Sequence, residues 1–239
     1  MRKMLARLIF ASYTPKRIQS LVQHLIGGPR LETVRFGDGH LFECFTGEKY
    51  WWMRDAYDEE QRLELEACLT SESVLFDIGA FAGFWEVVLA SRCRRVYAFE
   101  PSLVSFGRLS RNIAKNQISN VTTIQAAASD QTTKLHLVEK GRKSHISDVG
   151  IEVNAVRLDD YVLQHEAPTV VKIDIEGHAG AALRGMRQTL SHCRPILFLQ
   201  LNNTDEVRAC HAVTDDLGYQ YSRLGRRTDF PYRCRAVVN

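Results

Sequence analysis

The sequence lacks several features that would place a protein in a class at once. Its 239 residues contain no apolar run of about 18 residues, the length that a membrane-spanning helix requires. The six cysteines are scattered and form no C-x-x-C pair, which argues against a zinc site and predicts reduced thiols in a cytoplasmic protein. The formal net charge of +3 is too small to indicate binding to nucleic acid. A membrane-spanning, zinc-binding or nucleic-acid-binding protein is therefore not expected.

The first 70 residues predict a helical and hairpin cap. The opening MRKMLARLIFA is a poor match to a signal peptide, because Arg7 interrupts its short apolar stretch. Apolar residues at helical spacing predict an amphipathic helix there and a second one over residues 16–26. We expect a homodimer contact, if one forms, to use these two helices. Alternating runs around residues 37–39 predict a hairpin, and residues 58–69 predict a helix with acids in its first turn.

From residue 74 onward the pattern changes to alternating strands and helices. Strands are predicted at residues 73–79, 95–101, 121–127, 169–177 and 195–203, with helices at 103–116 and 178–190 among them. This alternation predicts an α/β domain over residues 71–239, with a parallel sheet covered on both faces. Residues 131–162 predict an inserted hairpin. The runs at 219–224 and 232–238 predict an antiparallel pair at the sheet edge.

The first of these strands ends in D-x-G-x-x-x-G, formed by Asp77, Gly79 and Gly83. A dehydrogenase would need G-x-G-x-x-G, which the chain lacks. An acid before the glycines repels a pyrophosphate and suits a cationic ligand such as S-adenosylmethionine, which carries a sulfonium and an ammonium. A plain strand-to-helix turn is the alternative interpretation of this stretch.

The next two strand ends fit a nucleoside. Glu100 follows the glycines by about 20 residues, where an acid accepts the ribose hydroxyls of NAD or S-adenosylmethionine alike. Gln125 and the small residues that begin with Ala126 would leave a slot for a flat adenine ring.

The fourth strand end, VVKIDIEGHAG, is the most unusual stretch. Strand alternation predicts that Lys172, Asp174 and Glu176 share one face, where charges are costly unless paired or used. A structural lysine–aspartate pair with a solvated glutamate is the alternative. Gly177 allows a sharp exit, and His178 follows it. The fifth strand end brings polar groups that can hydrogen-bond a polyol: Gln200, Asn202 and Asn203.

These stretches together resemble the FkbM family of S-adenosylmethionine-dependent methyltransferases. VLFDIGAFAG, VYAFEP, NVTTIQAAASD, VRLDDY and VVKIDIEGHAGAALRGM occur in that family's order and spacing, over roughly residues 57–205. The resemblance implies a class I methyltransferase fold, a Rossmann-like, mostly parallel seven-stranded sheet with its last strand antiparallel. It also implies O-methylation of a hydroxyl on a sugar, glycoside or other secondary metabolite.

The resemblance assigns roles to residues at matching positions. Asp174 falls where the methyl group is presented, and Asp174, Glu176 and His178 are the candidate catalytic groups. A histidine's ordinary pKa of about 6.5 suits proton transfer near neutrality, although His178 could equally begin a helix without any chemistry. The predicted cofactor-binding residues are Asp77, Gly79, Ala80, Phe81, Gly83, Glu100, Pro101, Gln125, Ala126 and Asp174.

Three positions depart from the family pattern. Phe81 replaces an asparagine, Ala179 replaces a glutamate, and Gln200 replaces a glutamate at the fifth strand end. These departures keep open an alternative function, a cofactor-binding pseudo-enzyme or regulatory module. No [DN]-P-P-[YF] follows the fourth strand, which argues against amine acceptors. The fifth strand end contributes no acid, so no metal is predicted.

The acceptor is predicted to be a small molecule. Trp51, Trp52 and Tyr57 could stack on a sugar ring or pack the cap on the core, and Gln200 and Asn202 could hydrogen-bond the same molecule. The loop that contains Arg142, Lys143, Ser144 and His145 could contact a phosphate or carboxylate, although solvated loop residues have the same composition.

Overall fold

The computed structural model describes residues 30–35, 39–45, 59–224 and 232–238. The chain divides into two compact units, Met1–Glu59 and Glu60–Asn239. The helices predicted before residue 27, the homodimer contact assigned to them, and Trp51, Trp52 and Tyr57 lie outside the described residues. The predicted boundary between a cap and a cofactor-binding domain at residue 70 stays a prediction.

The first unit contains the predicted hairpin. Strands β1 (Leu31–Arg35) and β2 (Leu41–Phe45) pair in antiparallel register, with Thr33 opposite Glu43. Arg35 Nη1 donates a hydrogen bond to the carbonyl oxygen of Gly39 at 2.8 Å, and Gly39 has a φ of 95°, a value that glycine adopts readily.

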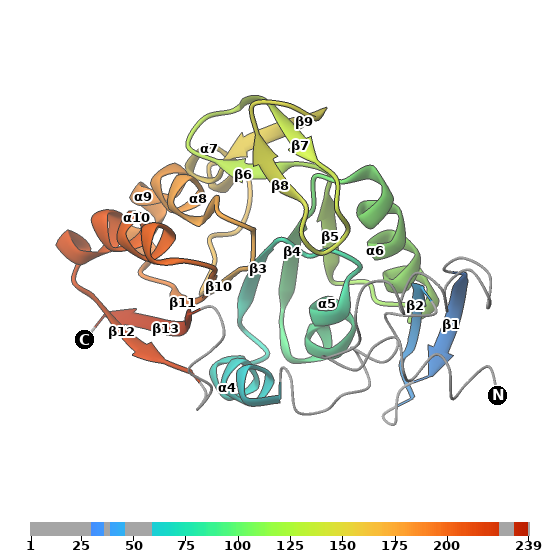
Figure 1. The fold of residues 1–239 in the computed structure, drawn as a ribbon. Coiled ribbons are helices and arrows are strands. Elements are labelled where there is room, and N and C mark those ends of the chain that lie inside the picture. Colours follow the sequence, from blue (N-terminus) through green and yellow to red (C-terminus); the bar gives the residue numbers. More distant parts are fainter. Residues whose placement is uncertain (1–29, 36–38, 46–58, 225–231, 239) are drawn as a thin grey trace, which may run out of the picture. The chain divides into compact units, whose positions relative to one another are not determined.

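The second unit is built on a seven-stranded sheet (Figure 1). Its strands lie in the order β12-β13-β11-β10-β3-β4-β5. Their bounds are β3 Val74–Ile78, β4 Arg95–Phe99, β5 Val121–Ile124, β10 Val170–Ile173, β11 Ile196–Leu201, β12 Tyr219–Arg223 and β13 Tyr232–Val238. The sheet is mixed, because β13 runs antiparallel to both β11 and β12. The expected antiparallel edge pair is confirmed, and the reversal of β13 agrees with the mostly parallel sheet with an antiparallel last strand that the family resemblance implied.

Helices cover both faces of this sheet. Val74, Phe76 and Ile78 of β3 pack in one apolar cluster with α8 (Ala179–Gly185), α9 (Arg187–Cys193) and α10 (Thr204–Thr214). Leu75 points to the other face and packs with α4 (Glu59–Cys68) and α5 (Phe84–Leu89). A central strand buried on both sides explains why this run has no polar alternation except at Asp77. The remaining helical segments are η1 Ala90–Arg92, α6 Leu103–Lys115, α7 Leu158–Val162 and η2 Asp215–Leu217.

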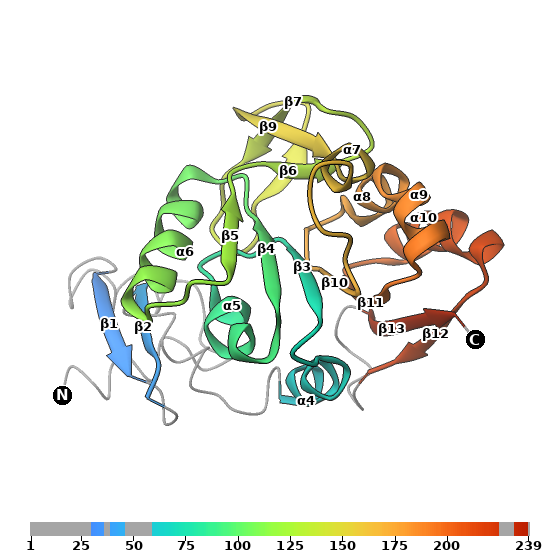
Figure 2. The ribbon, with the colours of Figure 1, turned by 180° about the vertical axis from the view of Figure 1, so that it is seen from behind.

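The segment predicted as an inserted hairpin forms a larger structure. Strands β7 (Thr133–Val138), β8 (His145–Ser147) and β9 (Ile151–Arg157) join β6 (Ala127–Ser129) in a four-stranded sheet of order β6-β9-β7-β8. The strand expected over residues 121–127 is therefore two strands, β5 and β6, in different sheets. Figures 1 and 2 show this small sheet at the end of the central sheet where β3, β4 and β5 finish.

Two boundaries near the fourth strand also differ from expectation. Strand β10 ends at Ile173, so strand alternation does not extend to Asp174 and Glu176, and the prediction that they share a strand face with Lys172 is wrong. The helix predicted over residues 178–190 is divided at Met186 into α8 and α9. Gly185 ends α8 close to the small sheet, since a Cβ there would lie 1.8 Å from the carbonyl oxygen of Ser129.

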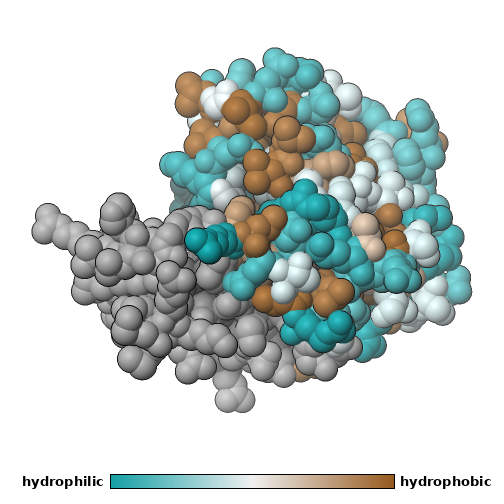
Figure 3. Space-filling model, turned by 90° about the vertical axis from the view of Figure 1, so that its right-hand side faces the viewer, coloured by the Kyte–Doolittle hydropathy of each residue, from teal (hydrophilic) through white to brown (hydrophobic). Residues whose placement is uncertain are grey.

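The surface adds two observations. Across the described residues, no helix combines the length and apolarity needed to cross a membrane. On the face drawn in Figure 3, hydrophobic residues form separate groups among hydrophilic ones. Exposed large apolar side chains include Leu103, Val104 and Val149.

Candidate active site

The carboxyl ends of four neighbouring strands are joined into one edge by backbone hydrogen bonds. N–H groups at each strand exit donate to the last carbonyl of the next strand, and the bonds run from Asp174 to Ile78 (2.9 Å), from Gly79 and Ala80 to Phe99 (3.0 Å each), and from Glu100 to Ile124 (3.0 Å). Between β3 and β10 the direction of strand progression reverses. Ligands of open α/β sheets bind at such a switch point, so this edge is the candidate site.

The loop after β3 depends on its glycines. Gly79 has a φ of 90°, and a Cβ there would lie 2.2 Å from the carbonyl oxygen of Asp174. Gly83 has a φ of 84°, and a Cβ there would lie 2.7 Å from Cδ1 of Leu109 on α6. The glycines therefore let the loop lie directly against the β10 exit and against α6.

Phe81 holds an unusual backbone conformation in this loop. Its φ is 50°, in the left-handed region that asparagine tolerates better than a bulky aromatic residue. Arg108 lies over its ring, with Cζ 5.2 Å from the ring centroid. Because the FkbM pattern has asparagine here, this chain replaces a conformationally suited residue by one that is held through its ring and backbone.

Glu100 connects this loop to the start of α6. Its Oε2 accepts a hydrogen bond from Phe81 N at 2.9 Å, and its Oε1 accepts one from Ser102 N at 2.8 Å. The side chain is buried, and burial raises the pKa of Glu100 to about 7, although the two N–H donors oppose that rise. Each carboxylate oxygen retains a lone pair for a ligand hydroxyl.

A cluster of three buried ionisable side chains lies beneath the loop. Lys172 Nζ on β10 lies 2.8 Å from Asp77 Oδ1 on β3, and both side chains are at most 2% exposed. Asp77 is therefore the aspartate that pairs with Lys172. The sequence analysis expected Asp77 to contact the cofactor, whereas in the structure its Oδ1 is paired with Lys172 Nζ. Although burial works to lower it, the charges of Asp77 and Asp174 hold the pKa of Lys172 above its ordinary value.

Glu86 of α5 is the third member of this cluster, and the sequence analysis missed it. Its two carboxyl oxygens and Asp77 Oδ2 are buried and receive no hydrogen bond from an N–H or hydroxyl group of the described residues. Burial, and then the charge and hydrogen bond of Asp77, raise the pKa of Glu86 well above its ordinary value. A proton held on Glu86 and donated to Asp77 Oδ2 gives one oxygen of each acid a hydrogen bond and leaves one carboxylate opposite one ammonium.

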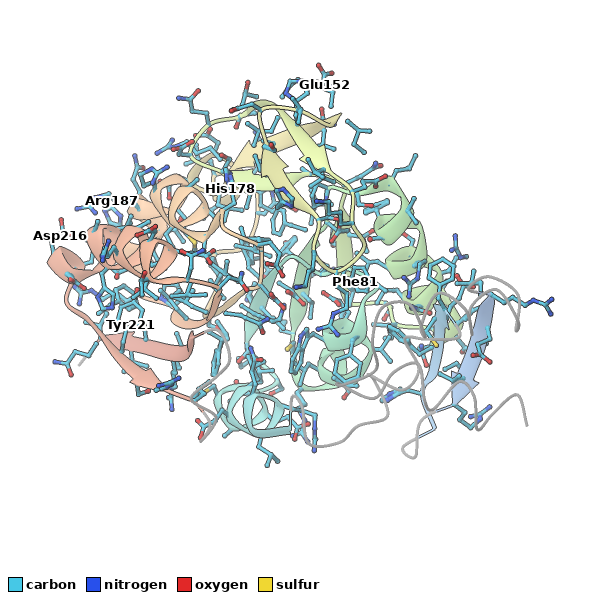
Figure 4. The ribbon with its side chains drawn as sticks, in the orientation of Figure 1. Phe81, Glu152, His178, Arg187, Asp216 and Tyr221 are labelled. Carbon is cyan, nitrogen blue, oxygen red and sulfur yellow. The ribbon has the colours of Figure 1, made fainter. Side chains whose placement is uncertain are left out.

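His178 lies at the start of α8 and faces the small sheet. Its Nε2 lies 3.0 Å from Ser129 Oγ, at the end of β6. Ser129 Oγ donates to Asp130 Oδ1 at 3.4 Å, and Arg184 Nη2 and Nε donate to Asp130 Oδ2 at 2.8 and 3.0 Å. Figure 4 shows His178 and Phe81 toward the end of the central sheet that faces the small sheet.

Glu176 and Glu206 flank the same exit. Burial and the charge of Asp174 raise the pKa of Glu176, and the charges of Lys143 and Arg142 act in the opposite direction. The two cations belong to the β7–β8 turn, which extends from the small sheet toward the central sheet in Figure 1. Glu206 of α10 is buried, and its carboxylate accepts hydrogen bonds from Ala179 N and Asn202 N at 3.4 and 2.7 Å.

The other predicted residues lie around this edge with different exposures. Ala126 is buried after β5, Gln125 is exposed, and Pro101 is half-buried beside Glu100. Gln200 is buried within β11. Asn202 follows β11, with its Nδ2 buried and without a hydrogen-bond partner among the described residues.

Four residues that contact the candidate site were not predicted: Glu86, Ser129, Glu139 and Glu206. Glu139 accepts a hydrogen bond from Ser102 Oγ at 2.5 Å. Of these four, only Glu86 could have been found from the sequence. It is an acid within the apolar run FWEVVL of a short helix, and a buried acid requires a partner.

Comparison with known proteins agrees with this architecture. The switch-point edge, the glycine loop and the sheet with one reversed strand define a class I methyltransferase fold. The family model "Methyltransferase FkbM domain" matches residues 77–221. The chain belongs to the FkbM methyltransferase family, which confirms the resemblance found in the sequence.

Individual relatives are distant. A hexuronic acid methyltransferase, AglP of Haloferax volcanii, is 27% identical over 199 residues, covering 79% of this chain and 82% of its own. The crystal structure of an FkbM methyltransferase from Methylobacillus flagellatus matches with a TM-score of 0.57 and 17% identity. That match covers 99% of this chain, which spans 57% of the other chain. TYW2 of M. jannaschii, solved with AdoMet, matches with a TM-score of 0.52 and 14% identity over 88% of this chain and 85% of its own.

The buried cluster makes a prediction about stability. Lys172→Met should lower the free energy of unfolding by about 3–5 kcal/mol, because it leaves the Asp77 carboxylate buried without its cation. Urea denaturation followed by circular dichroism measures the change. The matched control is Lys134→Met, which breaks the exposed pair of Lys134 and Glu152 and should cost no more than about 1 kcal/mol.

The same experiment checks the proton on Glu86. Because its pKa is raised in the folded chain, wild-type stability should fall as pH rises above the ordinary value of 4.5. Glu86→Gln imitates the protonated acid, so it should fold well and reduce that fall. A Lys172→Met protein as stable as the Lys134→Met control would contradict the assigned pairing.

Proposed function

We propose that this protein transfers a methyl group from S-adenosylmethionine to a hydroxyl group of a sugar or glycoside. The observation that carries the proposal is the bond between Phe81 N and Glu100 Oε2, which holds the glycine loop against the acid of the next strand. Family membership supports methyl transfer, and the hexuronic acid methyltransferase among its relatives supports a sugar acceptor.

The residues at the strand exits fit this cofactor. Each carboxylate oxygen of Glu100 has a lone pair left to accept a hydrogen bond from a ribose hydroxyl. The loop of residues 79–83 can approach the cofactor closely because its glycines carry no side chains. Ala126 offers a small buried side chain near the adenine position. When bound, S-adenosylmethionine supplies an electrophilic methyl group. Asp174 is the residue that we place beside that methyl, since its backbone contacts the glycine loop.

The chain's own residues then have to align the acceptor and remove its proton. Much of the rate of an in-line displacement comes from holding the two reactants in position. An alcohol also needs a base within hydrogen-bond reach, and Asp174, Glu176 and His178 remain the candidates at the β10 exit. We assign no metal to the reaction, and a cytoplasmic location stays part of the proposal.

The acceptor side is proposed to carry a negative charge. The β7–β8 turn is tightly folded, with Ser144 Oγ donating to the carbonyl oxygen of Gly141 at 2.7 Å and accepting from Lys140 N at 2.9 Å. Its exposed cations, Arg142 and Lys143, act electrostatically on Glu176 at the β10 exit. A carboxylate on the acceptor sugar, as the relative's hexuronic acid has, would suit this turn.

A cofactor-binding module without catalysis is the alternative function. The replacements at Phe81, Ala179 and Gln200 favour it. Glu206 at the Ala179 backbone and the His178 network supply polar groups that a mere binding module does not need.

The first prediction from this proposal concerns the choice of cofactor. S-Adenosylhomocysteine should raise the melting temperature of the protein, and NAD should leave it unchanged, because the loop after β3 lacks the G-x-G-x-x-G pattern that takes a pyrophosphate. Thermal shift measures both, and mass spectrometry with labelled cofactor and a panel of glycosides measures methyl transfer. Stabilisation by NAD and not by S-adenosylhomocysteine would contradict the cofactor assignment. Tight binding of S-adenosylmethionine without methyl transfer to any hydroxyl would favour a cofactor-binding module without catalysis.

A second prediction concerns Glu100. Glu100→Ala should weaken cofactor binding by about 30-fold, equivalent to about 2 kcal/mol, because two hydrogen bonds to a charged group are lost. Since the pKa of Glu100 is about 7, wild-type affinity should also decline as pH falls below neutrality and the carboxylate gains a proton. Calorimetry at several pH values tests this. Glu100→Gln should bind weakly with little pH dependence, and a wild-type affinity independent of pH would count against the ribose role.

A third prediction concerns the acceptor. Replacing Arg142 and Lys143 together by glutamine should raise KM for a glycoside of a sugar acid by about 10-fold, the effect of about 1.4 kcal/mol. The KM for the neutral methyl ester of the same glycoside should stay unchanged. Lys134→Gln, on the neighbouring strand β7, is the matched control. Equal changes for acid and ester would exclude charge recognition by this turn.

A further inference from the structure

We propose that His178 is the general base of the methyl transfer, and that Ser129, Asp130 and Arg184 are positioning residues that fix its imidazole in the tautomer with the proton on Nε2. This inference rests on the proposed function. Its basis is the hydrogen-bonded chain from Arg184 through Asp130 and Ser129 to His178, drawn from α8, β6 and the residue that follows β6.

The donor and acceptor in each hydrogen bond of this chain follow from Arg184, which can only donate. Arg184 is a permanent donor, and its hydrogen bonds lower the pKa of Asp130, so Asp130 is an ionised acceptor. The single hydroxyl proton of Ser129 is therefore directed to Asp130 Oδ1, 3.4 Å away. Ser129 Oγ then accepts from His178 Nε2 at 3.0 Å, which requires the proton of a neutral imidazole to be on Nε2.

This arrangement leaves Nδ1 of His178 unprotonated, so that it can act as a base. His178 Nδ1 has no hydrogen-bond partner among the described residues, and the side chain makes no cap bond to α8. The pKa of His178 lies below its ordinary value, chiefly because the ring is buried. Two charged groups also act on the ring: the Asp130 carboxylate raises its pKa, and the Arg184 guanidinium lowers it. The imidazole is therefore neutral at physiological pH, with the lone pair of Nδ1 available.

The backbone connects this nitrogen to the reaction edge. His178 N donates to the carbonyl oxygen of Ile175, which closes the turn over residues 175–178 that directly follows Asp174. The position of α8 is fixed from the other side, since Gly185 allows its helix to approach the carbonyl oxygen of Ser129. The hydrogen bond to Ser129 thus fixes the orientation of the His178 ring at the β10 exit.

The proton and the electrons balance in this arrangement. The acceptor O–H bond breaks and its proton forms an N–H bond on Nδ1, while the oxygen's electron pair forms the bond to the methyl carbon. The sulfonium sulfur keeps the electron pair of the broken S–C bond and becomes a neutral thioether. The imidazolium formed is stabilised through Ser129 and Asp130 and returns its proton to water.

The experiment reads the tautomer directly. Full-length protein labelled with ¹⁵N-histidine is studied by long-range ¹H–¹⁵N spectra at about pH 8, where an imidazole is neutral. The His178→Asn spectrum identifies the resonance of His178. The wild type should show the Nε2–H form, and Ser129→Ala should show a mixture of both tautomers. Asp130→Asn should lower the pKa of His178, and Arg184→Gln should raise it.

Kinetics complete the test. Ser129→Ala and Asp130→Asn should lower kcat on the order of 10-fold with little change in the KM of either substrate, since base orientation and not binding is affected. His178→Asn should lower kcat by about 100-fold or more. The exposed Ser191→Ala is the matched control and should behave like the wild type.

The outcomes separate this inference from the proposed function. An Nδ1–H tautomer in the wild type, or unchanged kcat in both Ser129→Ala and Asp130→Asn, would overturn the positioning role while leaving methyl transfer intact. Absence of turnover by the wild type on every hydroxyl acceptor would overturn the proposed function and the base role together.

Discussion

The ion pair between Lys172 and Asp77 is the interaction on which the rest of this site depends. It joins β10 to β3 where the strand progression reverses, at residues that are directly opposite in the sheet register. Water has no access to it, so the charges require each other, and Glu86 fits beside them as a neutral acid. The two strand exits above the pair are thereby held at a fixed separation, and the glycine loop and Asp174 meet over it.

Above this pair, the backbone does most of the positioning. The exits of β10, β3, β4 and β5 are joined by carbonyl–amide bonds, and Glu100 extends the same connection to the start of α6. A side chain at Gly79 would collide with the carbonyl oxygen of Asp174. Phe81 is tolerated in a strained conformation because its N–H is bound to Glu100 and its ring lies under Arg108. Contacts within the protein therefore hold the region proposed for the cofactor.

The small sheet supplies the acceptor side of the proposed reaction. It contributes Ser129 to His178, Glu139 to Ser102, and the turn with Arg142 and Lys143 that acts on Glu176. These groups come from a segment inserted between β5 and β10, outside the central sheet. The segment therefore contacts the β10 exit through His178 and also the proposed cofactor edge, since Ser102 N donates to Glu100.

The sequence by itself determined the alternation of strands and helices, the glycine turn after Asp77, the acid at Glu100 and the family, because these depend on local periodicity and short spacings. Only the tertiary structure decided that Lys172 pairs with Asp77, 95 positions away, and that His178 bonds to Ser129, 49 positions away. It also ended β10 at Ile173, which removed Asp174 and Glu176 from the strand face assigned to them. A buried charge takes whichever partner the packed strands bring within hydrogen-bond distance, and that distance is set by sheet register and helix packing, which no local pattern encodes.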